Sequence, residues 1–525
     1  MKRRNFLAAG AALAMPSVAR AQSARTLRFI PQADLSVLDP HFNTAYVTRN
    51  HAYMVYDTLY GLNGALQPSG QMVAGHTTED DGKLWTLTLR DGLRWHDGEP
   101  VLARDCVASI KRWAAKDTYG QTLLAVTDSL TAGSDKHIVF RLKKPFPLLP
   151  DALAKSGVYM PAMMPERLAL TDPALQVSEI IGSGPFRWMP KERLAGSRAV
   201  WERFADYAPM PTGTPDFTSG PKRVNLDRVI WTTVPDPATA AAALQTGEQD
   251  WWEYASADLL PLLRRNPNIT ARVQDPIGQA ALLRMNWLQP PFDNPAIRRV
   301  VLHAVIQSDY LAAMLGDDRT LWHDGMGAFT PGTKLANDAG LDAITGPRDI
   351  DALKRDLIAA GYKGERIALI VPTDFPNLKA LADVGADMLR RIGMNVDYQA
   401  MDWGTLLTRR AKKDLVANGG WSLFFTFSAG ADMSTPAGQL MMRGTGDKAW
   451  FGWPNDFKLE ELRDAWFEAP NLATQQSIAQ QLQLRVFETV PFVPLGQYFQ
   501  PTAYRKTVKG VLDGFATFWN ISLDG

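Results

Sequence analysis

The chain has 525 residues, of which 46% are apolar and 21% charged, and its formal net charge is +1. This is an ordinary globular composition, and at roughly 100–200 residues per domain the length predicts two to four domains. The near-zero net charge gives no argument for a nucleic acid or an anionic membrane as partner. A single cysteine, Cys106, excludes an internal disulfide, so burial of apolar side chains must stabilise the fold.

The first 21 residues have the features of an export signal. A basic start at Lys2–Arg4 precedes a short apolar stretch, Phe6–Met15, and the A-x-A sequence Ala19–Ala21. We expect cleavage after Ala21 and a periplasmic location. The paired arginines followed by Asn5 and Phe6 resemble a twin-arginine signal, with a plain secretory signal as the alternative. No later stretch reaches about 18 apolar residues, which predicts a soluble mature protein.

In the first half of the chain, local patterns predict short strands and helices. Residues 25–30 alternate as a strand, and 53–62 contain the end of a helix. Residues 83–98 have the pattern of a β-hairpin with its turn at Asp91-Gly92, and 100–113 predict a helix. The glycines at 182–185 break the chain.

The middle of the chain predicts a loop, a strand and a capped helix. Residues 205–221 are rich in Pro and Gly, which indicates an exposed loop, and 224–234 predict a strand. A helix should follow Asp236 as N-cap and stop at Gly247. Asp250-Trp251-Trp252 then predict a short strand.

After residue 280 the pattern changes to alternating strands and helices, which predicts βαβ units and a partly parallel sheet. The predicted strands are 281–287, 365–372, 394–401, 421–427 and 492–504, and the predicted helices are 295–315, 378–392, 405–416 and 471–489.

Motifs for covalent or metal chemistry are absent from the sequence. The glycines at 182–185 lack the lysine of a phosphate loop, and no G-x-S-x-G, H-E-x-x-H or C-x-x-C occurs. The seven histidines have no ligand spacing, which argues against a zinc site. Cys106 is expected to be a small core residue. These observations favour binding over catalysis, and we expect no cofactor.

Residues 84–113 resemble a signature of the family 5 extracellular solute-binding proteins, the receptors of ABC importers for dipeptides, oligopeptides and nickel complexes. The matching positions are Leu89, Arg90, Gly92, Trp95, His96, Asp97, Gly98, Pro100, Asp105, Val107 and Ser109. Further matching segments follow in the family's order: 182–186, 244–250, 286–298, 360–362, 392–396, 490–494 and 508–510.

The resemblance implies an α/β fold, the type II periplasmic binding protein flytrap, with two lobes plus an inserted extra domain. It implies a first lobe built from 22–45, 181–280 and 495–525, an inserted domain at 46–180, and the other lobe at 281–494. Hinge crossings are expected near Ala280 and Pro494. The implied function is that of a receptor, expected to be a monomer, that hands its ligand to the transmembrane subunits of an ABC permease.

Within that resemblance, Asp432 falls on the aspartate that pairs with the ligand's α-ammonium in peptide-binding members. Gly420-Trp421 matches the Gly-Trp pair at the start of that strand in the family, and 431–436 match the stretch that follows it. An ammonium buried in a closed cleft needs a partner, because an unpaired buried charge costs several kcal/mol. The alternative is that Asp432 caps a helix at 435–442.

The sequence also departs from the peptide-binding pattern. Ser434 and Thr435 stand where the dipeptide type has a second acid, and no basic residue for a ligand carboxylate is identifiable. Arg443 is nearby but is expected to be solvated. Aromatic and histidine side chains are further cleft candidates, with core packing as the alternative for each; these are Tyr46, His51, Trp403, Trp421, Phe425, Phe427, Trp450 and Tyr498.

Three other functions stay open. A receptor for a nickel chelate would need His51 or another histidine in the cleft. A receptor for a sugar, an opine or another non-peptide solute would use the same scaffold. An exported hydrolase would need a nucleophile and a base, for which the sequence has no motif.

Overall fold

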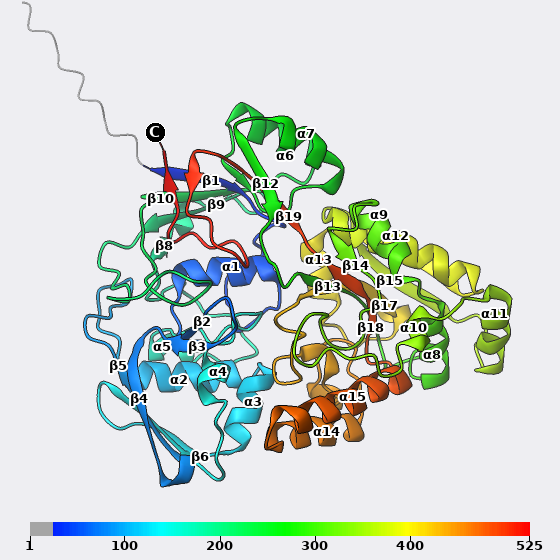
Figure 1. Ribbon diagram of the computed structural model, residues 1–525, viewed down its shortest axis with the longest axis horizontal. Helices are drawn as coiled ribbons and strands as arrows, with labels where there is room; N and C mark the ends of the chain where they lie inside the picture. The colour runs from blue at the N-terminus through cyan, green and yellow to red at the C-terminus, as the bar shows by residue number, and fades with distance from the viewer. Residues whose placement is uncertain (1–24, 525) are drawn as a thin grey trace, which may run out of the picture.

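The computed structural model describes residues 25–524, and these residues form two lobes that lie side by side (Figure 1). Three sheets organise the two lobes: a seven-stranded and a four-stranded sheet in one, and a six-stranded sheet in the other. The expected two-lobed α/β architecture is confirmed. The export signal predicted for residues 1–21 lies outside the described residues.

The seven-stranded sheet brings together strands from both ends of the chain. Its order is β12-β19-β11-β1-β10-β9-β8. The strands are β1 (Thr26–Ile30), β8 (Phe186–Trp188), β9 (Arg198–Arg203), β10 (Arg228–Thr232), β11 (Trp251–Trp252), β12 (Ile269–Val273) and β19 (Pro501–Arg505). Strand β1 is parallel to both of its neighbours, and Phe29 and Ile30 in it are fully buried. Helices α6 (Pro237–Thr246) and α7 (Leu260–Arg265) lie at one end of this sheet (Figure 1).

The four-stranded sheet lies in the same lobe and is antiparallel throughout, in the order β4-β5-β7-β6. Its strands are β4 (Val73–Glu79), β5 (Leu84–Leu89), β6 (Thr127–Ala132) and β7 (His137–Leu142). The helices between residues 46 and 169 are α1 (Tyr46–Val55), α2 (Ala103–Ala114), α3 (Thr118–Ala125), α4 (Leu149–Leu153) and α5 (Glu166–Ala169). Two small ribbons complete the lobe: β2 (Tyr60–Leu62) with β3 (Pro68–Gly70), and β20 (Val508–Lys509) with β21 (Ser522–Leu523).

The six-stranded sheet forms the core of the other lobe, in the order β14-β18-β13-β17-β15-β16. Its strands are β13 (Gln279–Met285), β14 (Trp322–His323), β15 (Arg366–Pro372), β16 (Asn395–Met401), β17 (Leu423–Ala429) and β18 (Val493–Tyr498). Its helices are α8 (Pro295–Ala304), α9 (Gln307–Leu315), α10 (Asp342–Thr345), α11 (Ile350–Ala359), α12 (Pro376–Arg391), α13 (Trp403–Arg409), α14 (Phe457–Glu468) and α15 (Leu472–Thr489). Every residue of β17 is buried between neighbours β13 and β15, so the chain after Ala429 leaves the sheet at its centre.

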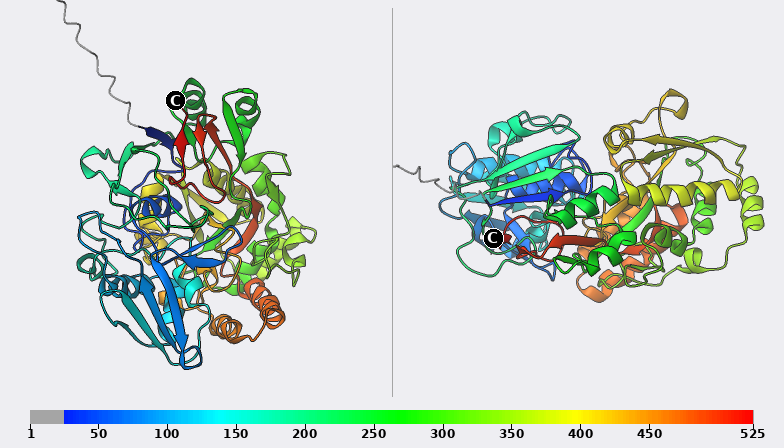
Figure 2. Two further views of the ribbon diagram at one scale, coloured as in Figure 1. Left: turned by 60° about the vertical axis from the view of Figure 1, so that its left-hand side comes forward. Right: turned by 90° about the horizontal axis from the view of Figure 1, so that it is seen from above.

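The chain passes between the seven-stranded and six-stranded sheets twice, at 274–278 and at 499–500. The two passages lie beside one another, because Gln279 at the start of β13 pairs with Tyr498 at the end of β18. Figure 2 shows the narrow connection between the lobes from a second direction. Strand β18 continues past the residue expected for the second crossing, Pro494. The domain boundaries given above stay predictions.

Several local predictions are confirmed. Helix α6 begins after Asp236, whose side chain accepts the Thr239 N–H, and ends at Gly247 in the left-handed conformation. Strands alternate with helices from β13 onward, and β15 is parallel to both β16 and β17. The parallel pairing follows from the helical crossovers, which return the chain to the same end of the sheet.

Two predictions made from short patterns are wrong. Residues 93–98 form no strand in the hairpin predicted at 83–98, because β5 takes its partners from β4 and β7. The helix predicted at 295–315 is two helices, since Val305 and Ile306 are extended between α8 and α9. The Val305 carbonyl accepts the Arg348 Nε–H at 2.9 Å there. In a continuous helix the same carbonyl would accept a backbone N–H instead.

Two more helix predictions fail around the cleft. Helix α13 ends at Arg409, short of the predicted 416. Residues 435–442 contain only a 3₁₀ turn at 440–442. Asp432 therefore has no α-helix to cap there.

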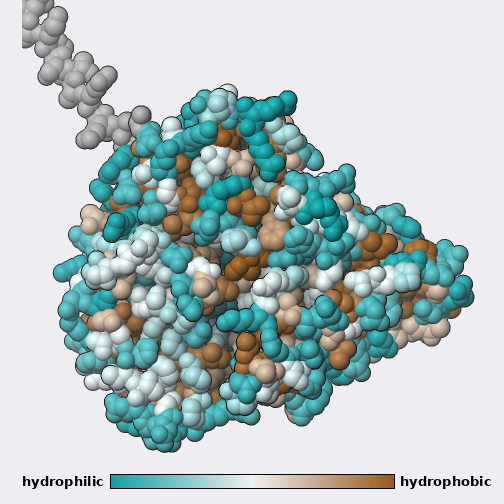
Figure 3. Space-filling model, viewed as in Figure 1, coloured by the Kyte–Doolittle hydropathy of each residue, from teal (hydrophilic) through white to brown (hydrophobic). Residues whose placement is uncertain are grey.

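The surface in Figure 3 is mostly hydrophilic, with hydrophobic side chains in small groups. Within residues 25–524, no helix combines the length and the apolar composition that crossing a membrane requires. Cys106 is fully buried, and burial raises the pKa of its thiol, in agreement with the expected core position.

Candidate functional site

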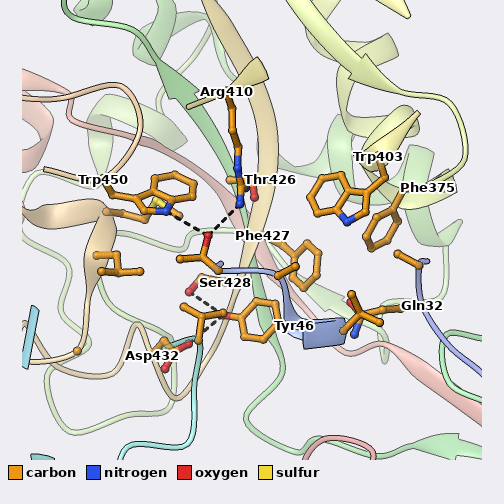
Figure 4. Close-up of a pocket in the computed structure, with 18 residues that line it drawn as sticks. Gln32, Tyr46, Phe375, Trp403, Arg410, Thr426, Phe427, Ser428, Asp432 and Trp450 are labelled. Atoms are coloured by element: carbon orange, nitrogen blue, oxygen red, sulfur yellow. Dashed lines mark hydrogen bonds between the residues drawn. The ribbon is translucent and has the colours of Figure 1, made fainter. Parts of the chain in front are cut away.

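A pocket that opens to solvent lies where the two lobes meet. One wall comes from residues 32–47 of the first lobe, and the other from α13, β17 and the chain after β17 (Figure 4). The lining side chains used below are Gln32, Thr44, Tyr46, Phe375, Trp403, Arg410, Phe427, Ser428, Asp432 and Trp450.

Asp432 lies three residues after the buried strand β17. Its backbone N–H closes a turn on the Ala429 carbonyl at 3.0 Å, which directs the side chain into the pocket. Burial raises the pKa of the carboxyl, and Lys155 opposes this from nearby. Lys155 itself pairs with Asp117. Within the described residues, no cation lies within ion-pair distance of Asp432 and no backbone N–H donates to its side chain.

Two segments of the other lobe contact Asp432. The Tyr46 hydroxyl donates to Asp432 Oδ2 at 2.9 Å, and it accepts the Ala429 N–H at 2.5 Å. Gly157 approaches from the other side so closely that a Cβ there would lie 1.8 Å from Asp432 Oδ1. The carboxyl is therefore enclosed only when the lobes are together.

Aromatic rings form the side of the pocket nearest Gln32. Phe427 stacks on Tyr46 with ring centroids 5.2 Å apart, and Phe375 meets Phe427 edge-on at 5.8 Å. Trp403 lies against Phe375 at 5.4 Å and opens helix α13, with Asp402 as its N-cap. These flat apolar faces suit an apolar or planar part of a ligand.

Arg410 and Trp450 close the end of the pocket opposite Asp432 (Figure 4). Arg410 Nη2 donates to Thr44 Oγ1 at 2.9 Å, and Trp450 Nε1 donates to the same oxygen at 3.3 Å. Burial lowers the pKa of Arg410 to about 9. The pocket thus has a carboxyl at one end and a guanidinium at the other.

The comparisons with known proteins agree with this architecture. The family described as "Bacterial extracellular solute-binding proteins, family 5 Middle" matches residues 67–450. The chain belongs to this family. It is 38% identical to a probable peptide ABC transporter periplasmic-binding protein, y4tO of Sinorhizobium fredii, over 98% of this chain and 97% of that protein.

Two solved structures share the type II binding-protein fold at low identity. AgaA of A. tumefaciens R10, in complex with agropinic acid, has a TM-score of 0.78 at 20% identity and covers 95% of this chain and 99% of its own. DppA of Helicobacter pylori, in complex with the peptide STSA, has a TM-score of 0.77 at 20% identity and covers 95% of this chain and 98% of its own.

Five of the nine candidates from the sequence line the pocket of this family 5 protein: Asp432, Tyr46, Phe427, Trp403 and Trp450. Their role in ligand binding stays a prediction.

The other four candidates lie outside the pocket. Trp421 packs on Phe424 and Trp453 in the core, and Phe425 packs on Tyr310 under helix α9. His51 is fully buried between Trp188 and Trp201 and accepts the Trp201 Nε1–H at 3.1 Å. Burial lowers the pKa of His51 to about 3, so it is neutral. Tyr498 is buried at the end of β18.

The sequence analysis missed Arg410 and misplaced Arg443. Arg443 was expected to be solvated, but only 9% of it is exposed and its Nε lies 3.0 Å from Glu460. Arg410 could have been found from helix spacing. Trp403, Leu406 and Arg410 follow one another at i, i+3 and i+7, so Arg410 lies on the apolar face of α13 and its extension, whereas Arg409 does not.

Proposed function

We propose that this chain is an exported receptor that binds a peptide or another amine-bearing solute in the pocket and delivers it to the transmembrane subunits of an ABC importer. Asp432 accepts the ligand's ammonium group. The exported location depends on the signal expected at residues 1–21, with cleavage after Ala21 and twin-arginine export as the finer hypothesis. The receptor works as a monomer and carries out no reaction on its ligand.

The observation that carries this proposal is the state of Asp432. It is a partly buried carboxyl in a pocket between two lobes, and its one hydrogen-bond donor among the described residues is the neutral Tyr46 hydroxyl. An ammonium that bonds to Asp432 replaces water with an opposite charge, which lowers the cost of burying the carboxylate. The names of the relatives point the same way, because y4tO is called a peptide transporter protein and DppA was solved with a peptide.

The geometry also couples binding to closure. Thr44 and Tyr46 from one lobe contact Arg410 and Asp432 from the other, so the pocket is complete only in the closed form. A ligand that touches both walls favours closure by the difference between its affinities for the closed and open states. The closed form is the one that a permease can distinguish from the empty receptor.

The alternatives gain less support from the structure. The nickel-chelate hypothesis depended on a histidine in the cleft, and His51 lies in the core instead. No cluster of three or more His, Cys, Asp or Glu suited to a metal occurs within residues 25–524. A hydrolase would be unusual in a family of solute-binding proteins. A non-peptide amine, such as an opine, remains compatible with Asp432.

Mass spectrometry of the small molecule retained by protein purified from the periplasm tests the proposal first. A peptide or amino-acid derivative is the expected result. Asp432→Asn should then weaken binding of that compound by about 2–5 kcal/mol in calorimetry, because it removes one member of a buried charge pair.

A control variant makes this result specific. Asp387 has a side chain that is 70% exposed on helix α12, outside the pocket, and Asp387→Asn should bind the compound like the wild type. Retention of a ligand without an amine, or unchanged affinity in Asp432→Asn, would contradict the proposal. Light scattering of the purified protein checks the monomer.

A further inference from the structure

A second set of contacts joins the two lobes away from the pocket. The Phe467 ring, near the end of α14, meets the rings of Tyr119 and Phe146 from the first lobe, with centroids 6.0 and 5.9 Å apart. Tyr119 lies on α3, and Tyr119 and Phe146 meet one another at 6.4 Å. Helices α3 and α14 approach each other where the lobes meet (Figure 1). None of the three rings lines the pocket, so their contacts do not depend on a bound solute.

The position of Phe467 on α14 directs its ring toward the first lobe. The buried stripe of this helix has the spacing i, i+3, i+4 and i+7 and consists of Leu459, Leu462, Arg463 and Trp466. Phe467 comes one residue after the stripe, about 100° further round the helix, and it is half-buried. Tyr119 and Phe146 are only 7% and 5% exposed while the lobes are together. Separation of the lobes would expose apolar area on all three rings, so their burial favours closure.

Two polar contacts between the lobes accompany the rings. Lys144 pairs with Glu468, the residue after Phe467, and both side chains are more than half exposed. Arg443 Nη1 donates to Gln121 Oε1 at 3.2 Å. Because an exposed ion pair contributes little in water, the rings supply most of the attraction, and the polar contacts orient the two surfaces.

These contacts are separate from those at the pocket. A groove that opens to solvent extends between the lobes from Leu440 and Trp450, which also border the pocket, to Phe146 and Phe467. The interface is therefore not one continuous core. Groups that share no neighbours contribute to an equilibrium independently, so the rings and the pocket residues should add separately to the free energy of closure.

We infer that Phe467, Tyr119 and Phe146 form a latch that keeps a measurable share of the ligand-free receptor closed. The apparent affinity of a receptor is its intrinsic affinity multiplied by the fraction in the binding-competent state. The latch therefore raises the affinity for every solute by the same factor and contributes nothing to the choice between solutes. This goes beyond the proposed function, because it concerns the empty protein and holds whatever solute the pocket takes.

Double electron–electron resonance between two spin labels measures the closed fraction without a ligand. Thr131→Cys on β6 and Ser477→Cys on α15 place one exposed label on each lobe, and the native Cys106 is fully buried and stays unlabelled. Dialysis from denaturant before labelling removes retained solute. The labelled parent should show a short-distance and a long-distance population. Phe467→Ala should lower the ratio of closed to open protein about tenfold, because it removes both ring contacts.

Two controls make the result specific. Phe457 lies at the start of the same helix with 77% of its surface exposed, and Phe457→Ala should leave the ratio unchanged. Lys144→Glu should lower the ratio about threefold, and a second change, Glu468→Lys, should restore it, because the ion pair returns with its signs exchanged. Both charged side chains are exposed, so this pair tests the contact even where Phe467→Ala destabilises the fold.

Three results would overturn the inference. The first is a ligand-free parent with only the open distances. The second is the same ratio in Phe467→Ala as in Phe457→Ala, and the third is a double charge variant that stays as open as Lys144→Glu. None of these results involves a solute, so the proposed function stands or falls separately, on the retained compound and Asp432→Asn.

Discussion

Two groups of aromatic side chains, one in each lobe, show how similar residues can form a closed core or a binding surface. The first group packs on the seven-stranded sheet and consists of Phe29, Trp188, Trp201, Trp231, Trp251 and Phe518. Trp201 and Trp231 lie only 4.5 Å apart, and Trp201 is fully buried. Its indole N–H is satisfied by His51. None of these six side chains lines the pocket.

The second group lines the pocket beside the six-stranded sheet. Trp403 and Trp450 are almost as buried, at 5% and 9% exposure, but both line the cavity. Charged groups at the two ends of the cavity, Asp432 and Arg410, lack ion-pair partners among the described residues. The comparison shows that burial alone does not distinguish core aromatics from site aromatics. What distinguishes the site aromatics is a charged group beside them that has no ion-pair partner within residues 25–524.

The largest effect is expected for a substitution in the first aromatic group, on the seven-stranded sheet. Trp201→Ala should lower the free energy of unfolding by about 3–5 kcal/mol, because it leaves a cavity among Trp188, Trp231 and His51 and removes the donor to His51. Urea unfolding followed by circular dichroism measures this. Ligand affinity of the folded variant should stay near that of the wild type.

Trp403→Ala is the corresponding tryptophan substitution in the second aromatic group, which lines the pocket. Part of the Trp403 ring already borders empty space, so its stability loss should be less than half that of Trp201→Ala, while its loss of affinity should be larger. The comparison fails if both variants lose the same stability and neither loses affinity.

The next effect concerns pH and the Asp432 end of the pocket. In the ligand-free protein, burial raises the pKa of Asp432, and a bound ammonium would lower it again. The affinity for an amine should therefore be complete above the ligand-free pKa and fall as the pH drops from 7 toward 4, by at most about tenfold per pH unit. Calorimetry across this range measures the slope.

Asp432→Asn supplies the control for the pH profile, since it removes the titrating group. The variant should show weak binding with a flat profile. A wild-type profile as flat as that of the variant would show that Asp432 does not change its charge when the ligand binds, and would weaken the distinction drawn between the two aromatic groups.

The sequence predicted the fold better than it predicted the site. The alternation of strands and helices after residue 280 is a local pattern, and the structure has it. The failures occur where tertiary partners override local preference. Strand β5 pairs with β4 and β7 rather than with residues 93–98, and the Val305 carbonyl accepts from Arg348 rather than from the backbone of a longer helix.

For the site, the order of motifs led to Asp432, but periodicity could not separate pocket aromatics from core aromatics. Phe425 and Phe427 lie on the same strand, but Phe425 packs on Tyr310 of α9 and only Phe427 lines the pocket. Arg410 was missed because its significance depends on the absence of a counter-ion. That absence becomes visible only when every neighbour is placed.

The smallest expected effect concerns the contact that joins the two walls. Tyr46→Phe removes the hydroxyl that donates to Asp432 and accepts the Ala429 N–H, and it leaves the ring on Phe427. In the ligand-free protein this contact stabilises closure, whereas a bound ammonium takes over part of its role at the carboxylate. We therefore expect ligand affinity to change by only about 1 kcal/mol, and the closed population of the empty receptor, measured by small-angle scattering, to decrease. A loss as large as that of Asp432→Asn would show instead that Tyr46 is itself an anchor, and that the carboxyl end of the pocket depends on two residues rather than one.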